Sequence, residues 1–190
     1  GVKNLIKTAS FEHKVDHVKY RKDIKLKITD RSSAALDFSV TGFYEDAVYN
    51  EKIMQNYSKK DQNDRFRSYI NDFYPFNEVK DVSGKKDTVT GGYTISFRSD
   101  VKPGFCEEGG TMSFSPFISD FNIPYFKYDR KEGRKTDIYI GAPDVKETEI
   151  SIEFPQNMQI VDMPASEKFI FKDVFTISSE LSLNGNLLTL

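Results

Sequence analysis

The sequence predicts a mainly β domain, a β-rich α+β fold with an antiparallel β-sandwich-like architecture and one helical segment near residues 46–74. Three observations predict it. The chain has 16 Phe and 10 Tyr but no Trp, and these aromatic side chains are enriched in strands. Its 7 Pro and 11 Gly are spread along the chain and supply turns. Apolar residues alternate with polar ones at period two on both sides of the helical segment.

Length and charge set broad limits on the function. A chain of 190 residues buries a sizeable core without disulfides or metals, and its single cysteine cannot form an internal disulfide. Apolar residues make up 38%, charged residues 29%, and the net charge is −2, which gives no general attraction to nucleic acid. Gly1 stands where an initiator Met is usual, and the chain stops inside what reads as a strand of a terminal hairpin. We therefore expect a fragment of a longer protein.

The first predicted elements form a hairpin. Ile24, Leu26 and Ile28 alternate with charged residues, and Leu36 and Phe38 repeat the pattern after a polar turn. Such alternation is typical of two antiparallel strands with one face in water. The basic residues at 19, 21, 22, 25 and 27 are therefore interpreted as a solvated sheet face rather than a nucleic-acid surface.

The helical segment follows Gly42. Apolar residues recur at helical spacing at positions 53, 54 and 57, and again at 66, 69, 70 and 73. A polar stretch over 58–64 divides the two groups, and Ser58 followed by Asp61 resembles a capping box. Pro75 closes the segment.

The remainder of the chain reads as strands and turns. Strands are expected at 79–82, 88–97, 111–115, 137–140, 148–154, 158–161 and 168–178, with a terminal hairpin turning at Asn184-Gly185. The charged stretch 127–135 is the candidate linker. We expect a β-rich domain with a helical insertion over 1–127, and a smaller antiparallel β domain, or a second sheet of the same unit, over 128–190.

Cys106 is the obvious candidate nucleophile, and we interpret it as a turn or strand-edge residue. A reactive thiolate needs a histidine or a helix N-terminus nearby, whereas Glu107 and Glu108 disfavour the thiolate by charge repulsion. No catalytic residue is therefore assigned.

The two histidines and the glycine pairs give no metal or cofactor site. His13 and His17 would face one side of a helix, but on a strand they would lie about 13 Å apart. The pairs at 91–92 and 109–110 match no phosphate-binding motif, so no cofactor is expected. Glu147 and Glu149 lie on one strand face, a pattern too common on exposed strands to indicate a glycosidase.

An aromatic stretch over 114–126 is the candidate binding surface. If exposed, it would form a platform for a carbohydrate or a peptide, whereas core packing is the plainer interpretation. With the loop that follows, the candidate residues are Phe114, Phe117, Phe121, Tyr125, Phe126, Tyr128 and Arg130.

Five stretches together resemble the C-terminal region of bacterial proteins that combine a DUF3857 domain, a transglutaminase-like domain and a DUF3858-type domain. They are LDFSVTG at 36–42, YTISF at 93–97, MSFSPF at 112–117, YDR at 128–130 and IEFPQNMQIVDMP at 152–164. The resemblance implies that a papain-like catalytic Cys, His and Asp lie upstream of this region. It also implies export to the periplasm or the cell exterior, often in Bacteroidetes.

The expected function is therefore that of a non-catalytic accessory domain. It would support the neighbouring transglutaminase-like domain or bind a partner polypeptide. The alternative is a ligand- or carbohydrate-binding sandwich that uses the aromatic stretch, and an enzyme dependent on Cys106 is the third hypothesis. No nucleic-acid partner and no membrane span are expected from the composition.

Overall fold

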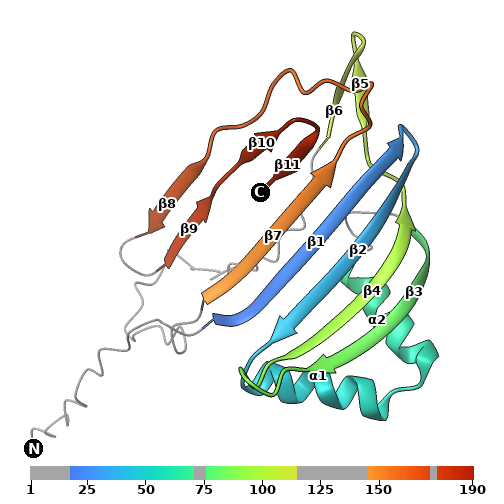
Figure 1. Cartoon of the computed structure of the whole chain (residues 1–190), viewed down its shortest axis with the longest axis vertical. Helices are drawn as coiled ribbons and strands as arrows, with labels where there is room; N and C mark the ends of the chain where they lie inside the picture. The colour runs from blue at the N-terminus through green and yellow to red at the C-terminus, as the bar shows by residue number, and fades with distance from the viewer. Residues whose placement is uncertain (1–17, 71–75, 115–144, 172–174) are drawn as a thin grey trace, which may run out of the picture.

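The computed structural model describes residues 18–70, 76–114, 145–171 and 175–190, and the mainly β class is confirmed. The largest element is a seven-stranded sheet with the strand order β10-β11-β7-β1-β2-β4-β3 (Figure 1). Its strands are β1 (Val18–Asp30), β2 (Ser33–Gly42), β3 (Phe76–Lys86), β4 (Tyr93–Val101), β7 (Val145–Glu153), β10 (Ser182–Asn184) and β11 (Leu187–Thr189). Two small hairpins flank it, formed by β5 (Cys106–Glu108) with β6 (Thr111–Ser113) and by β8 (Glu167–Phe171) with β9 (Phe175–Ser179).

The predicted first hairpin is confirmed as β1 and β2, which pair antiparallel. Even-numbered residues of β1 from Lys22 to Ile28 are buried, and most of their odd-numbered neighbours are exposed. The Asp30 carboxylate closes the turn by accepting hydrogen bonds from the backbone N–H of Ser32 (2.7 Å) and from its hydroxyl (2.8 Å). Local alternation and turn chemistry therefore suffice to form this pair.

The predicted helical segment consists of two helices, α1 (Glu45–Asn56) and α2 (Lys59–Ile70). The chain becomes extended at Tyr57, and Ser58 starts the second helix. The Asp61 N–H donates to Ser58 Oγ (3.2 Å), and Ser58 Oγ donates to Asp61 Oδ2 (2.7 Å). The polar stretch thus breaks the segment because its side chains satisfy backbone groups at the helix end.

The core lies between the helices and the inner face of the sheet. Phe97 on β4 stacks on Phe38 of β2 (ring centroids 4.8 Å apart) and on Phe66 of α2 (5.8 Å). Helix α1 contacts β2, β4 and β3, and α2 contacts β3, so the helices lie against one end of the sheet (Figure 1). At the other end the inner face carries Ile24, Leu26, Ile150 and Ile152, all buried.

Several features of the fold differ from the sequence-based expectation. The sheet is mixed rather than wholly antiparallel, because β7 runs parallel to β1 over nine paired positions from Val18↔Val145 to Lys27↔Glu153. Two helices, rather than a second large sheet, cover the β2–β4–β3 end of the inner face. The stretch 158–161 forms no strand, and the long strand expected over 168–178 folds back as β8 and β9.

The terminal hairpin forms, with its turn one residue later than expected. Asn184 pairs with Leu187, so the two loop residues are Gly185 and Asn186, and Gly185 has φ 63°. A glycine in this conformation at the first loop position is typical of a type II′ turn. The expected domain boundary at 127/128 and the strand expected at 137–140 lie outside the described residues. Strands from both sides of that boundary share the large sheet.

Candidate strand-binding edge of the sheet

Of the predicted aromatic surface, only Phe114 lies within the described residues. It is partly buried, packs against the core and contacts Phe105 with ring centroids 5.1 Å apart. The other candidates lie outside the described residues: Phe117, Phe121, Tyr125, Phe126, Tyr128 and Arg130. His13 and His17 also lie outside them.

Cys106 lies on the exposed hairpin of β5 and β6. Its backbone pairs with Ser113, and the Ser113 hydroxyl donates to the Cys106 carbonyl at 3.4 Å. Across the described ranges, no group of three or more His, Cys, Asp or Glu side chains is placed to hold a metal ion. The described hairpin therefore gives Cys106 a strand position, in line with its interpretation as a strand-edge residue.

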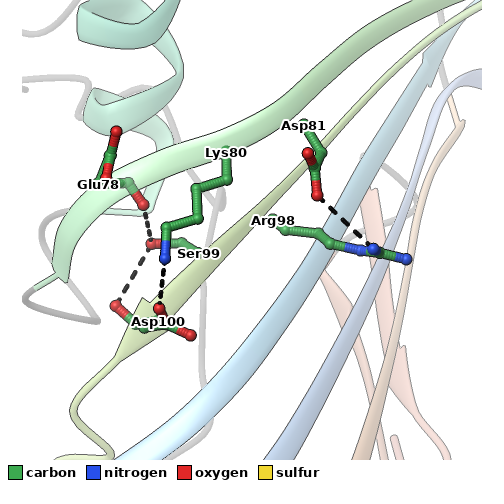
Figure 2. Close-up of polar contacts among 6 residues, drawn as sticks. All are labelled: Glu78, Lys80, Asp81, Arg98, Ser99 and Asp100. Carbon is green, nitrogen blue, oxygen red and sulfur yellow. Dashed lines mark hydrogen bonds and ion pairs between the residues drawn. The ribbon is translucent and has the colours of Figure 1, made fainter.

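The β3 edge of the large sheet is irregular and charged. Its pairing with β4 has two register shifts, and Asp81 within the second has φ 54°. Figure 2 shows Lys80 bound to Asp100 (2.7 Å) and Arg98 beside Asp81 (3.6 Å) across the two strands. The Ser99 hydroxyl donates to the Glu78 carbonyl at 2.9 Å. Bulges and charges of this kind hinder the addition of another strand.

The opposite edge is regular, and the described residues of β11 pair with the C-terminal part of β7. Strand β11 pairs with β7 at 151–153, and Ile150 and Leu190 then exchange two backbone hydrogen bonds of 2.9 Å. Within the described residues, no strand pairs with the outer side of 145–149. Strand geometry has period two, so the backbone N–H and C=O of Lys146 and Thr148 point to the same side as those of Ile150. These four groups face the open edge.

A hollow of about 610 Å³ lies beside this open edge. Glu147, Thr148 and Glu149 of β7 line one side. Glu180 and Leu181, between β9 and β10, and Ser182, the first residue of β10, line another. Thr189 and Leu190 at the end of β11 also line it. We call it the strand slot. It lies along β7 where β11 ends, and the five open residues span about 16 Å of extended chain.

The strand slot is acidic. Three carboxylates, those of Glu147, Glu149 and Glu180, line it together with one guanidinium, that of Arg21. The Arg21 guanidinium donates to Glu147 Oε2 from Nη2 (2.6 Å) and Nε (2.8 Å), and this hydrogen bond raises the pKa of Arg21. Opposite charges elsewhere on this outer face also pair, as Arg98 does with Asp37 and Lys27 with Glu153.

A second hollow, of about 280 Å³, lies on the inner face near the start of β1. It contains Lys22, which is only 5% exposed, and both Lys22 and Lys146 lie over the ring of Tyr20. Burial, together with the charge of Lys146, lowers the pKa of Lys22 to about 8. Lys22 therefore lies on the core side of the sheet, and its interpretation as part of a solvated face was wrong. Its even-numbered position, shared with Ile24 and Leu26, indicates the buried face.

The sequence pattern missed the open edge itself. Glu147 and Glu149 were recognised as neighbours on one strand face, but no nearby sequence feature shows that their strand lies beside β1.

Among the described helices, neither is long and apolar enough to cross a membrane. No protein-family model, curated protein or solved structure matches the chain.

Proposed function

We propose that this domain is a non-catalytic accessory module that binds a partner polypeptide by β-strand addition at the open edge of β7. The observation that carries the proposal is the strand slot, in which a regular, half-covered strand edge borders a hollow of about 610 Å³. The five-stretch resemblance supports a parent protein in which this module follows a transglutaminase-like domain. The same resemblance supports export to the periplasm or the cell exterior.

The contrast between the two sheet edges supports strand addition. Unpaired backbone groups on a regular edge bind an extended peptide through main-chain hydrogen bonds, while side chains on either face select its sequence. The β3 edge carries register shifts, a left-handed Asp81 and charged pairs that hinder this mode. On β7, by contrast, the pairing with β1 continues without a shift from Lys146 to Glu153.

The alternative is a carbohydrate- or ligand-binding surface built from the aromatic stretch. Its one described member, Phe114, packs against Phe105 and the core. The polypeptide proposal has the larger support, because all the residues that line the strand slot lie within the described part of the chain. Of the aromatic candidates, only Phe114 does.

A displayed library of random 12-residue peptides, selected against the purified chain, tests the proposal. Thr148→Pro removes the outward N–H from the open edge without removing a donor to β1, and such edge positions tolerate proline. Thr148→Ala is the matched control because it shortens the side chain and keeps the N–H. Selected peptides are then synthesised, and their binding is measured by calorimetry.

We expect selected peptides to bind Thr148→Ala within about threefold of the original chain, since only a side-chain contact is shortened, and to bind Thr148→Pro at least about tenfold more weakly. Circular dichroism must show that Thr148→Pro is folded. If Thr148→Pro is not folded, the test becomes hydrogen exchange of the Thr148 amide in the original chain, which should slow when the peptide is added. A library that yields no binder, or binders indifferent to both tests, would overturn the proposal.

A further inference from the structure

The last hydrogen-bonded pair of β11 fixes how an added strand would run. Leu187, Leu188 and Thr189 lie opposite Glu153, Ile152 and Ser151, and Leu190 exchanges hydrogen bonds with Ile150. A strand that continues this ladder lies antiparallel to β7. Its first residue then faces Glu149 and its fifth faces Val145.

The two faces of β7 fix which side chains the added strand would carry. Glu147 and Glu149 project to the outer face with Ser151 and Glu153, where most of their neighbours are polar. Thr148 lies on the other face, in line with Ile150, which is 2% exposed, and close to Leu190. Residues opposite each other on antiparallel strands contact directly, so the partner positions opposite Glu149 and Glu147 have acidic surroundings. The position between them has apolar surroundings from Ile150 and Leu190, and the position after Glu147 lies opposite Lys146 on the inner face.

Charge in the strand slot favours a basic partner. Arg21 already binds Glu147, whereas Glu149 and Glu180 have no ion pair among the described residues. Opposite charges across neighbouring strands stabilise their pairing, and like charges destabilise it. A partner with Lys or Arg opposite Glu149 and Glu147 places opposite charges across the two strands and avoids repulsion between like charges.

We infer that the strand slot takes up an extended segment of a partner polypeptide that runs antiparallel to β7 and carries Lys or Arg at alternate positions. The inference rests on the proposed function and adds the direction and the side-chain chemistry of the bound strand. The basic side chains lie opposite Glu149 and Glu147 on the outer face. An apolar residue between them packs beside Thr148, Ile150 and Leu190.

Two blocked nine-residue peptides test the charge preference, one alternating Lys and Val and the other alternating Glu and Val. At low ionic strength, fluorescence anisotropy should show the Lys–Val peptide binding about tenfold more tightly. In the double variant Glu149→Gln with Glu180→Gln the ratio should fall to about threefold or less. Glu108→Gln removes an exposed acid from the distant β5 and should leave the ratio unchanged.

Disulfide trapping tests the direction. In a Cys106→Ser background, Glu149→Cys should capture a five-residue Lys–Val peptide with an N-terminal cysteine about tenfold faster than one with a C-terminal cysteine. Val145→Cys should show the opposite preference. A reversed pattern in both variants would overturn the antiparallel orientation.

The two proposals fail in different ways. If both peptides bind equally and Thr148→Pro abolishes both, strand addition stands and the basic partner is refuted. If neither peptide nor any selected sequence binds, the proposed function fails as well. If the free chain is a dimer that Thr148→Pro dissociates in sedimentation, a second copy occupies the edge and the partner segment is refuted.

Discussion

Ile150 and Leu190 form a reciprocal backbone pair, in which each N–H donates to the other's carbonyl at 2.9 Å. It is the last pair of the β7–β11 ladder, and the outer side of β7 continues beyond it without a neighbouring strand among the described residues. Covered and open backbone groups therefore lie two residues apart on the same side of one strand. That difference is directly measurable.

Amide hydrogen exchange should distinguish the two positions. The Ile150 N–H is held by Leu190, so it should exchange at least about tenfold more slowly than the Thr148 N–H, which faces the open edge. Glu149, whose N–H points toward β1, serves as the protected control within the same strand. Equal protection at Thr148 and Ile150 in the free chain would contradict an open edge.

Gly42→Ala should destabilise the domain by about 1–3 kcal/mol. An added Cβ would lie 2.7 Å from the Asp46 carbonyl carbon and 2.9 Å from Asn50 Nδ2, so α1 would have to move away from β2. Gly104→Ala is the matched control because nothing lies within 4 Å of its added Cβ. Urea denaturation of both variants gives the comparison, and equal stabilities would show that α1 does not pack this closely.

Phe66→Ala and Phe97→Ala should each lower the free energy of unfolding by about 3–5 kcal/mol. Their rings stack at 5.8 Å and join α2 to the sheet, so the double variant should show a coupling of about 0.5–1.5 kcal/mol. Phe66→Ala combined with Ile152→Ala, three strands away from β4 in the sheet, should be additive. A double-mutant cycle without coupling at Phe66 and Phe97 would contradict the stack.

Lys22 should make stability rise with pH in the alkaline range. Its pKa is about 8 in the folded chain against an ordinary 10.5, so between these values the unfolded chain binds more protons. Folding is therefore favoured increasingly as the pH rises from about 8 to 10.5, and the full cost of a buried charge applies below 8.

Lys22→Met should then stabilise the domain by about 1–2 kcal/mol at pH 7 and reduce this alkaline rise. Lys25→Met removes an exposed lysine from the same strand and serves as the control. Chemical denaturation at pH 7, 8, 9 and 10 measures both. A Lys22→Met chain that keeps the full rise would contradict the assignment to this side chain.

Asp81→Val should cost about 1–2 kcal/mol, because a β-branched residue strongly disfavours φ near 54°. Asp81→Gly adopts this conformation freely and loses only an exposed ion pair with Arg98. Its thermal stability should stay within about 0.5 kcal/mol of the original. If valine were tolerated as well as glycine, the bulge would not be left-handed at this residue.

The features predicted correctly are those that a few neighbouring residues determine. Alternation at Ile24, Leu26 and Ile28 defined β1 and its buried face, and the Ser58 and Asp61 pair marked the break between the helices. The turn lies one residue later than expected because Gly185 is the first residue of a Gly-Asn loop rather than the second residue of an Asn-Gly loop. The same glycine suits either position. Lys22 shares the parity of the core positions, but basic side chains around it made the strand read as solvated.

By itself, the sequence determined the mainly β class, the first hairpin, the helical segment and the terminal hairpin, because strand and helix periods are local steric properties of the chain. Only the tertiary structure decided that β7 lies parallel to β1 and that β11 pairs with residues 151–153 on its outer side. Ile24 of β1 and Ile150 of β7, for example, lie side by side although they are more than a hundred residues apart along the chain. Their pairing depends on burying a shared apolar face, for which no short stretch of sequence carries a signal.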